Sequence, residues 1–315
     1  MQYHSCSQIE RFSLSAVELI TNNNALRICC EISDEIQGVS LDKNAEEILE
    51  RIIKLREDLI SLGKQFENNN QISKKLKGCI NCPQFRVGDY YEKDYISYIN
   101  LSMYPAPCQC KCIYCNFHND NKFMRIDEKH IKYYNRLFET LELMINDGLI
   151  SSDSEWQISS GEITIHPFKK RILDLVRDYK VTFYTNCFIF DKDIADILQK
   201  NSSAKINLSI DAGTGNSWKK VKGYNNFNKM LENLQMYSSK SLPSQITLKY
   251  IILPDINDSI EDFDGIVDIM KRLKTKHLII SRDLNSKHKE KDLLKANILA
   301  EILKENGLGY ELTLY

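Results

Sequence analysis

From residue 95 onward, short apolar runs alternate with longer amphipathic segments. Runs rich in β-branched and aromatic residues predict strands at residues 95–102, 155–159, 181–185, 205–210, 245–252 and 277–281. The clearest predicted helix spans residues 127–148, where Ile131, Tyr134, Phe138, Leu141 and Ile145 recur at three- and four-residue spacing. Further helices are expected at residues 168–179, 191–200, 226–238, 260–273 and 291–305, and an edge strand at residues 310–315.

Strands that alternate with helices in this way predict an α/β fold with a parallel sheet, either open and doubly wound or curved into a barrel. In such sheets ligands bind beyond the carboxyl ends of the strands. The residues that follow the predicted strands are therefore expected on one rim. They include Gly161, Glu162, Cys187, Asp211 and Leu253.

Residues 1–94 are expected to form a separate, mostly helical domain, with a second domain over residues 95–315. Apolar residues at helical spacing predict a helix over residues 42–62. Asp42 is its expected N-cap, and Gly63 its expected stop. Glu46 and Glu47 would lie in its first turn, where the helix dipole favours negative charge.

The composition is that of an ordinary globular protein, with 43% hydrophobic and 27% charged residues. The formal net charge is −1, so no overall field favours nucleic acid or an anionic membrane surface. No apolar run has membrane-spanning length, and the N-terminus does not have the pattern of a signal peptide. We therefore expect a cytoplasmic protein with neither nucleic acid nor membrane as a partner.

The cysteines change this picture, because nine of the ten lie in the first 115 residues. Clustering of this kind favours metal sites over scattered packing thiols. Cys108, Cys110, Cys112 and Cys115 fall within eight residues, and thiolates suit an iron–sulfur cluster or zinc. With Cys110 set aside, the spacing is C-x3-C-x2-C. Three ligands would leave one iron of a four-iron cluster open, whereas four would also suit a zinc site.

The chain from about residue 95 to 300 resembles the radical S-adenosylmethionine (SAM) superfamily. Cys108, Cys112 and Cys115, with Tyr114, match its signature C-x3-C-x-aromatic-C. Three further stretches resemble its second-, fourth- and fifth-strand motifs: residues 159–167, residues 207–211 with 221–223, and residues 251–253 with 257–258. In the second-strand motif, usually Gly-Gly-Glu-Pro, Ser160 replaces the first glycine and Ile163 the proline.

The resemblance implies a partial (βα)6 parallel barrel in which Cys108, Cys112 and Cys115 hold a 4Fe–4S cluster. The open iron would chelate the amino and carboxylate groups of SAM. The implied SAM contacts are Ser160, Gly161 and Glu162 at the amino group, Ser209 and Asp211 at the ribose or methionine end, and Leu253 and the backbone beside Tyr114 at adenine. A flavodoxin- or ferredoxin-type partner would reduce the cluster. One electron from the cluster would then cleave SAM to methionine and a 5′-deoxyadenosyl radical that abstracts a substrate hydrogen.

A second resemblance concerns the N-terminal cysteines. Residues 24–30 and 78–83 resemble the auxiliary-cluster SPASM or twitch region of many radical SAM enzymes, although that region normally follows the barrel. Asn24 stands where the pattern carries glycine. The resemblance implies a second 4Fe–4S cluster on Cys6, Cys29, Cys79 and Cys82, with Cys30 as an alternative to Cys29. A structural zinc site on Cys79 and Cys82 is the competing interpretation.

Two functional questions stay open at this point. Cys187 could face the radical and return a hydrogen atom, or it could be a buried thiol that only packs. The substrate could be a peptide, as for natural-product maturases, or a sugar or other small metabolite. A non-catalytic iron–sulfur carrier or a zinc-stabilised binding protein would leave the rim of Glu162, Ser209 and Asp211 without a purpose.

Overall fold

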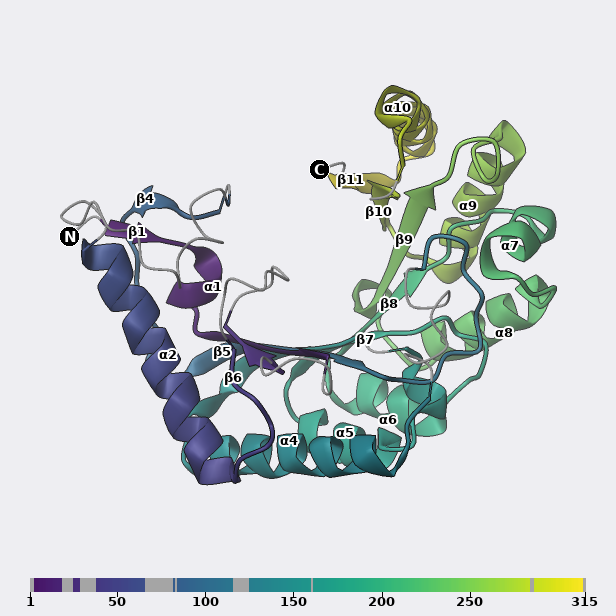
Figure 1. Cartoon of the computed structure of the whole chain (residues 1–315). Helices are drawn as coiled ribbons and strands as arrows, with labels where there is room; N and C mark the ends of the chain where they lie inside the picture. The colour runs from purple at the N-terminus through teal and green to yellow at the C-terminus, as the bar shows by residue number, and fades with distance from the viewer. Residues whose placement is uncertain are drawn as a thin grey trace. The chain divides into compact units, whose positions relative to one another are not determined.

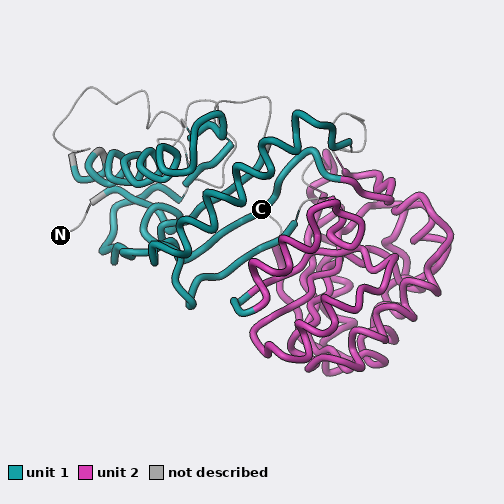
Figure 2. The backbone as a smooth tube through the Cα atoms, turned by 90° about the horizontal axis from the view of Figure 1, so that it is seen from below, with its two compact units in different colours: residues 1–106, 125–160, 178–180 teal, residues 107–124, 161–177, 181–315 magenta. Residues whose placement is uncertain are grey.

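A computed structural model describes residues 3–18, 25–28, 38–65, 82, 84–115, 125–159, 161–283 and 286–313. The chain divides into two compact units, coloured separately in Figure 2. Unit 1 comprises Met1–Ala106, Arg125–Ser160 and Asp178–Lys180, and unit 2 comprises Pro107–Met124, Gly161–Arg177 and Val181–Tyr315. Each unit is described by itself.

Unit 2 is built on parallel strands that succeed one another along the chain. They are β7 (Lys180–Tyr184), β8 (Lys205–Ser209), β9 (Ile246–Ile252), β10 (His277–Arg282) and β11 (Gly309–Thr313). The helices that connect them pack along the outer face of the curved strands (Figure 1): α6 (Lys192–Lys200), α8 (Phe227–Ser238), α9 (Ile260–Leu273) and α10 (Lys289–Glu305). The predicted α/β fold with a parallel sheet is confirmed.

Helix starts in unit 2 follow from local capping. Asp191 precedes α6, and its Oδ1 accepts hydrogen bonds from the backbone N–H groups of Asp193 and Ile194. Ser259 precedes α9 and accepts from Asp262 N–H at 3.1 Å. Apolar faces of both helices are buried, as their amphipathic sequences predict.

The sequence did not suggest α7 (Gly215–Lys222), which follows β8. Thr214 caps its start by accepting from Ser217 N–H at 3.2 Å, and Gly223 ends it in the left-handed conformation at φ 80°. Trp218 and Val221 are the buried apolar residues of this eight-residue segment, and two such positions carry too little periodicity to be recognised.

Among its described residues, unit 1 has three parallel strands, β2 (Ser13–Glu18), β5 (Ile96–Tyr104) and β6 (Ile150–Ile158), with β3 (Leu26–Arg27) antiparallel to β2. The helices described there are α1 (Ser7–Glu10), α2 (Ala45–Gln65) and α4 (Glu128–Asn146). A separate pair joins β1 (Tyr3–Ser5) to β4 (Arg86–Gly88).

The N-terminal segment of unit 1 shares a sheet with later strands. The backbone of β2 pairs with that of β5, so residues 13–18 extend the sheet that contains residues 96–104. The domain boundary expected at residue 94 stays a prediction. The sequence of β2, Ser-Leu-Ser-Ala-Val-Glu, alternates too briefly to stand out, yet Leu14 and Ala16 are buried.

Helix α2 differs from the expectation at both ends. It begins at Ala45, and the side chain of Asn44 accepts from Glu47 N–H at 2.8 Å, so Asn44 caps the helix in place of Asp42. It continues through Gly63 to Gln65, because a helix held by a buried face tolerates one glycine. Glu46 and Glu47 do lie in the first turn.

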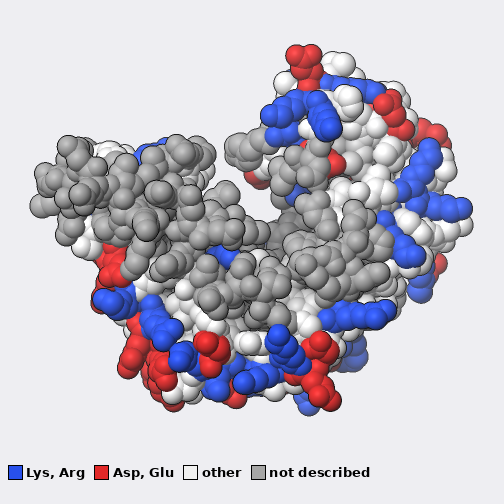
Figure 3. Space-filling model, viewed as in Figure 1, with Lys and Arg blue, Asp and Glu red and all other residues white. Residues whose placement is uncertain are grey.

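Charged side chains of both signs are exposed in unit 1 and unit 2. On the face seen in Figure 3, lysine and arginine side chains lie interspersed with aspartate and glutamate, in keeping with the net charge of −1. Among the described residues, no helix combines the length and the apolar character needed to cross a membrane.

The backbone of α9 lies close to the backbone of the turn between β8 and α7. A Cβ atom added at Gly265 in α9 would lie 2.3 Å from the carbonyl oxygen of Gly213. We predict that Gly265→Ala lowers the free energy of unfolding by about 1–3 kcal/mol through overpacking, although alanine is the better helix former.

Chemical denaturation followed by circular dichroism measures this effect. The matched control is Asp268→Ala on the exposed side of the same helix, which should leave stability unchanged or raise it slightly. Equal behaviour of the two variants would contradict the close approach.

Candidate functional site

The candidate site lies in unit 2, at the edge where β7, β8 and β9 end. Because these strands are parallel neighbours, the residues that follow them share one edge of the sheet. The cysteine loop, defined as residues 107–115, is bonded to the end of α7. Lys111 N–H donates to Lys222 O and Ile113 N–H donates to Val221 O, both at 3.0 Å. The expected cysteine motif is therefore attached to the segment beyond β8.

The thiols of the cysteine loop differ in exposure. Cys108, Cys112 and Cys115 are half-buried, whereas Cys110 is buried. A hydrogen bond from Cys110 and then the charge of Lys222 lower the pKa of Cys112 to about 6, and a Cys110 hydrogen bond also lowers the pKa of Cys108. Thiolates are the metal-binding form of cysteine, so these residues fit an iron–sulfur cluster.

Within the described part of the chain, no three His, Cys, Asp or Glu side chains converge on a single ion position. A four-iron cluster binds each thiolate at a different iron, so its ligands need not converge on one point. The three half-buried thiols of this loop can therefore serve as ligands at three different irons.

A polar trio, of which Lys222 and Asp211 are buried and Tyr114 is half-buried, holds the second half of this loop. Lys222 Nζ lies 2.6 Å from Asp211 Oδ2 and 2.7 Å from Tyr114 Oη, and Tyr114 Oη donates to the same Asp211 oxygen at 2.6 Å. The Lys222 and Asp211 side chains are only 2% and 0% exposed. Burial opposes the charge of Lys222, yet Asp211 and Cys112 keep the lysine pKa above its ordinary value.

Asp211 also joins the trio to β9. Its Oδ1 accepts from Ile251 N–H at 2.7 Å, and its carbonyl accepts from Asn257 Nδ2 at 2.8 Å. Asp211 itself has a left-handed backbone, at φ 48°. Asp211 and Tyr114, both expected to contact a cofactor, thus have their polar atoms engaged with protein groups.

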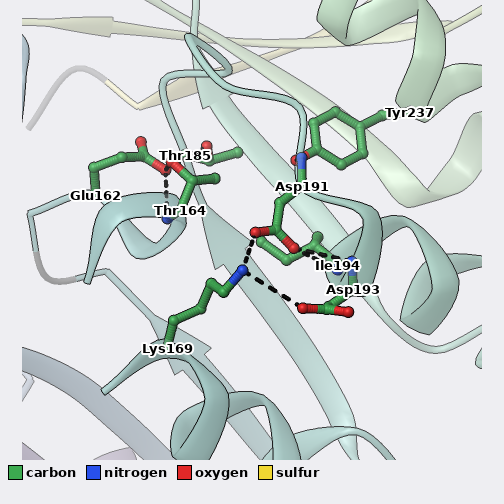
Figure 4. Close-up of polar contacts among 8 residues, drawn as sticks. All are labelled: Glu162, Thr164, Lys169, Thr185, Asp191, Asp193, Ile194 and Tyr237. Atoms are coloured by element: carbon green, nitrogen blue, oxygen red, sulfur yellow. Dashed lines mark hydrogen bonds and ion pairs between the residues drawn. The ribbon is translucent and has the colours of Figure 1, made fainter. Parts of the chain in front are cut away.

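Glu162 is fully buried and accepts hydrogen bonds from several donors (Figure 4). Its Oε1 accepts from Thr164 N–H, Thr164 Oγ1 and Thr185 Oγ1, and its Oε2 accepts from Asn186 N–H at 2.7 Å. Burial raises the pKa of Glu162. This carboxylate connects the turn after Gly161, at φ 51°, to the end of β7. Ser160, the first residue of the expected motif, lies outside the described residues.

Asn186 follows the third predicted strand, but its role was not predicted from the sequence. Its Nδ2 lies 3.9 Å from Cys108 Sγ, and its Oδ1 accepts from Gln109 Nε2 at 3.2 Å and from Phe188 N–H at 3.0 Å. Asn186 therefore holds the first half of the cysteine loop. The available signal was its place directly after a predicted strand, beside Cys187.

Lys222 was also missed as a site residue. It stands four residues after Trp218, on the apolar side of α7, and a lysine at such a position is unusual because its charge needs a buried partner. The four-residue spacing between Trp218 and Lys222 was therefore the signal in the sequence that could have indicated a buried lysine.

The remaining expected residues of this rim occupy the strand ends. Cys187 is fully buried at φ 55°, its N–H bonded to Thr185 Oγ1 and its carbonyl to Asn233 Nδ2. Burial raises the pKa of this thiol, and the packing role fits these surroundings. Ser209 ends β8 and is half-buried, and Leu253 follows β9 and is 5% exposed.

Of the N-terminal cysteines, the structure describes Cys6 and Cys82. Cys6 is buried at the start of α1, and Cys82 is half-buried. The pairing of Ser5 with Arg86 places the segments that carry them beside each other, and His4 stacks on Phe85 with ring centroids 5.8 Å apart. Cys29, Cys30 and Cys79 lie outside the described residues.

A polar pocket of about 440 Å³ lies elsewhere in unit 2, between the starts of α7 and α9. None of the cysteines lines it. Three of its acidic side chains have partners: Asp255 pairs with Lys291, Asp258 pairs with Lys295, and Asp262 accepts from Ser217 and Ser259. Outside this pocket, Lys169 forms an ion pair with the buried Asp191, as Figure 4 shows.

Comparisons with known proteins agree with this geometry. A family model described as the radical SAM superfamily matches residues 107–270. SuiB from Streptococcus suis is similar in fold, with a TM-score of 0.54 and 13% identity over 85% of this chain. The structure of the same protein bound to SAM gives a TM-score of 0.53 and 13% identity over 86% of this chain. The structure bound to precursor peptide SuiA gives a TM-score of 0.51 and 14% identity over 82% of this chain.

The chain spans 55%, 59% and 62% of the lengths of these three SuiB chains. No curated protein matches the sequence.

His166, just beyond Glu162, gives a test of this region. It is buried, its Nδ1 accepts from Phe168 N–H at 3.2 Å, and burial lowers its pKa from 6.5 to about 4. The neutral imidazole therefore stabilises the fold above pH 6.5, and that stability is lost as the pH falls toward 4. We predict that this group lowers the free energy of unfolding of the wild type by up to about 3 kcal/mol between pH 6.5 and pH 4, since one pKa unit is about 1.4 kcal/mol.

In His166→Asn, whose amide oxygen can replace Nδ1, this part of the pH dependence should disappear. Urea unfolding between pH 7 and pH 4 provides the measurement. His288→Asn, at an exposed position, is the control and should retain the wild-type slope. Identical slopes for wild type and His166→Asn would show that the group does not titrate in this way.

Proposed function

This chain belongs to the radical SAM superfamily, and from that premise we propose that it cleaves SAM at a 4Fe–4S cluster and takes a hydrogen atom from a peptide. One observation carries the proposal. Three half-buried thiols, with the spacing of the family signature, lie on a loop bonded to the segment that follows β8, at the ligand-binding edge of parallel strands.

Cys108, Cys112 and Cys115 would hold the cluster. The cluster would supply the electron that cleaves SAM, and SAM would supply the 5′-deoxyadenosyl radical that abstracts hydrogen. The protein orients the thiols for this chemistry: Asn186 contacts Cys108, and the backbone of residues 111 and 113 is tied to α7. Cys110, which is buried, would not be a ligand.

The SAM contacts that we propose come from the strand ends. Gly161 can bring its backbone close to the amino group, because it has no side chain in the way. Its φ of 51° is a left-handed conformation that glycine adopts readily. Ser209 would bond the ribose or the methionine end, and Leu253 would pack on adenine. Ser160 belongs to the same proposal.

Glu162, Asp211 and Tyr114 complete the proposed SAM site, but their contacts give them a different part in it. Because their polar atoms bond protein groups, they would act by fixing the backbone that faces the cofactor. Cys187 stays a proposed hydrogen donor only if a substrate reaches it, and its full burial favours packing.

The peptide substrate rests on analogy. SuiB was solved with its precursor peptide and shares this fold, and we extend a peptide substrate to this chain as a proposal. Incubation with small peptides encoded near the gene, followed by mass spectrometry, tests it. A mass change only in a sugar or other metabolite would favour the alternative substrate class.

We also propose an auxiliary 4Fe–4S cluster on Cys6, Cys29 or Cys30, Cys79 and Cys82, and a flavodoxin- or ferredoxin-type electron donor. The support for the cluster is the pairing of β1 with β4, which brings the Cys6 and Cys82 segments together. Zinc at these cysteines is the competing outcome.

The first test compares two cysteines of the same loop. After anaerobic reconstitution with iron and sulfide, reduction with dithionite and addition of SAM, wild type should form 5′-deoxyadenosine, detected by chromatography. Cys112→Ser should fall to the background without enzyme because a cluster ligand is lost, whereas Cys110→Ser should retain product. A wild-type protein with an intact cluster but no product would favour an electron carrier.

The second test counts iron in a variant with Cys108, Cys112 and Cys115 all replaced by alanine. If the auxiliary cluster forms, about four irons per chain should remain, with iron–sulfur absorption. Adding Cys82→Ser should remove them. Zinc without iron in the triple variant would contradict the auxiliary cluster and support a structural zinc site.

A further inference from the structure

We propose that Tyr114, Asp211 and Lys222, here called the clamp, form a positioning device for the cysteine loop, so that retention of the cluster depends on the clamp as a unit. The inference rests on the proposed function, in which Cys108, Cys112 and Cys115 hold a cluster. It gives Tyr114, Asp211 and Lys222 a positioning role that the spacing of the cysteines does not predict.

The clamp joins three segments that are far apart in the sequence. Each of its members touches the other two, at 2.6–2.7 Å: the tyrosine from the cysteine loop, the aspartate after β8 and the lysine at the end of α7. Asp211 adds a fourth segment through Ile251 N–H of β9. A loop held in this way has little freedom to move away from the strand ends.

The clamp lies directly at two proposed ligands. Tyr114 stands between Cys112 and Cys115 in the sequence, and Cys115 N–H donates to Cys112 O at 3.0 Å. On the other side, a Cβ atom added at Gly223 would lie 2.8 Å from Lys111 Cβ, so α7 and the loop are in close contact. Displacement of Tyr114 would therefore move both cysteines.

The burial of two clamp members, Lys222 and Asp211, requires their pairing to be kept. A lysine and an aspartate with 2% and 0% exposed side chains are stable only while each has the other as partner. Buried ion pairs contribute little net stability compared with apolar residues, and their best-attested role is to specify one arrangement of the chain. Here the specified arrangement is that of the loop against α7.

The contacts indicate positioning instead of direct binding. Asp211 Oδ2 accepts from both Lys222 and Tyr114, and Oδ1 accepts from backbone, so both carboxylate oxygens already have donors. The clamp would act on the cluster through the cysteines, as residues that orient metal ligands do in other metalloproteins.

The test measures how fast the reconstituted cluster is lost to a chelator, EDTA, from the full chain under anaerobic conditions, by iron–sulfur absorbance. Tyr114→Phe and Lys222→Met should each lose it about tenfold faster or more, the usual range for residues that support metal ligands. Electron paramagnetic resonance of the reduced cluster should change in the same variants. Tyr224→Phe and Lys219→Met, exposed positions near the same loop and on the same helix, are the matched controls.

The double variant Tyr114→Phe/Lys222→Met tests the clamp as a unit. Because removal of one member disables the others, the double variant should lose the cluster no faster than the worse single variant. Rates that multiply would show independent effects and overturn the proposal. Should Lys222→Met fail to fold by circular dichroism, Asp211→Asn takes its place in the cycle.

The wild-type protein separates failure of the clamp from failure of the proposed function. Wild type that takes up no iron would overturn both. Wild type that holds the cluster, with Tyr114→Phe and Lys222→Met matching their controls in rate and spectrum, would overturn the clamp alone.

Discussion

A buried charge must have a partner, and in this protein that constraint determines how the cysteine loop is held. Lys222 and Asp211 lie within 2.6 Å of each other with almost no exposure, and Tyr114 completes the arrangement. The chain cannot place the lysine elsewhere in the interior without leaving a charge unpaired. The end of α7, the turn after β8 and the cysteine loop must therefore fold together.

The rim residues of unit 2 show a division between groups that face outward and groups that hold the backbone. Glu162 and Asp211 have the chemistry of cofactor ligands, yet their carboxylates bond the chain itself. Buried carboxylates with several donors rigidify their surroundings, which suits a site where backbone groups do the binding. Ser209 and the three proposed cysteine ligands keep part of their surface exposed, and so do Tyr114 and Asn186.

Sequence periodicity was sufficient for the parallel sheet and most of its helices, since α4, α6 and α9 each have long apolar faces. It was insufficient for α7 and β2, which are short and owe their form to tertiary contacts. The cysteine motif was visible because its spacing is specific. Asn186 and Lys222 were not, because asparagine and lysine are common and only the folded chain brings them to the loop.

Helix α7 is fixed at both ends by a carboxylate from another part of the chain. At its start, Asp262 accepts from Gly213 N–H, Thr214 N–H and Ser217 Oγ, and at its end Lys222 meets Asp211. Eight residues of α-helix span about 12 Å, and each residue turns the helix by about 100°. One residue more or fewer would rotate Lys222 away from Asp211, so the length of α7 is as much a part of the site as the identity of any residue in it.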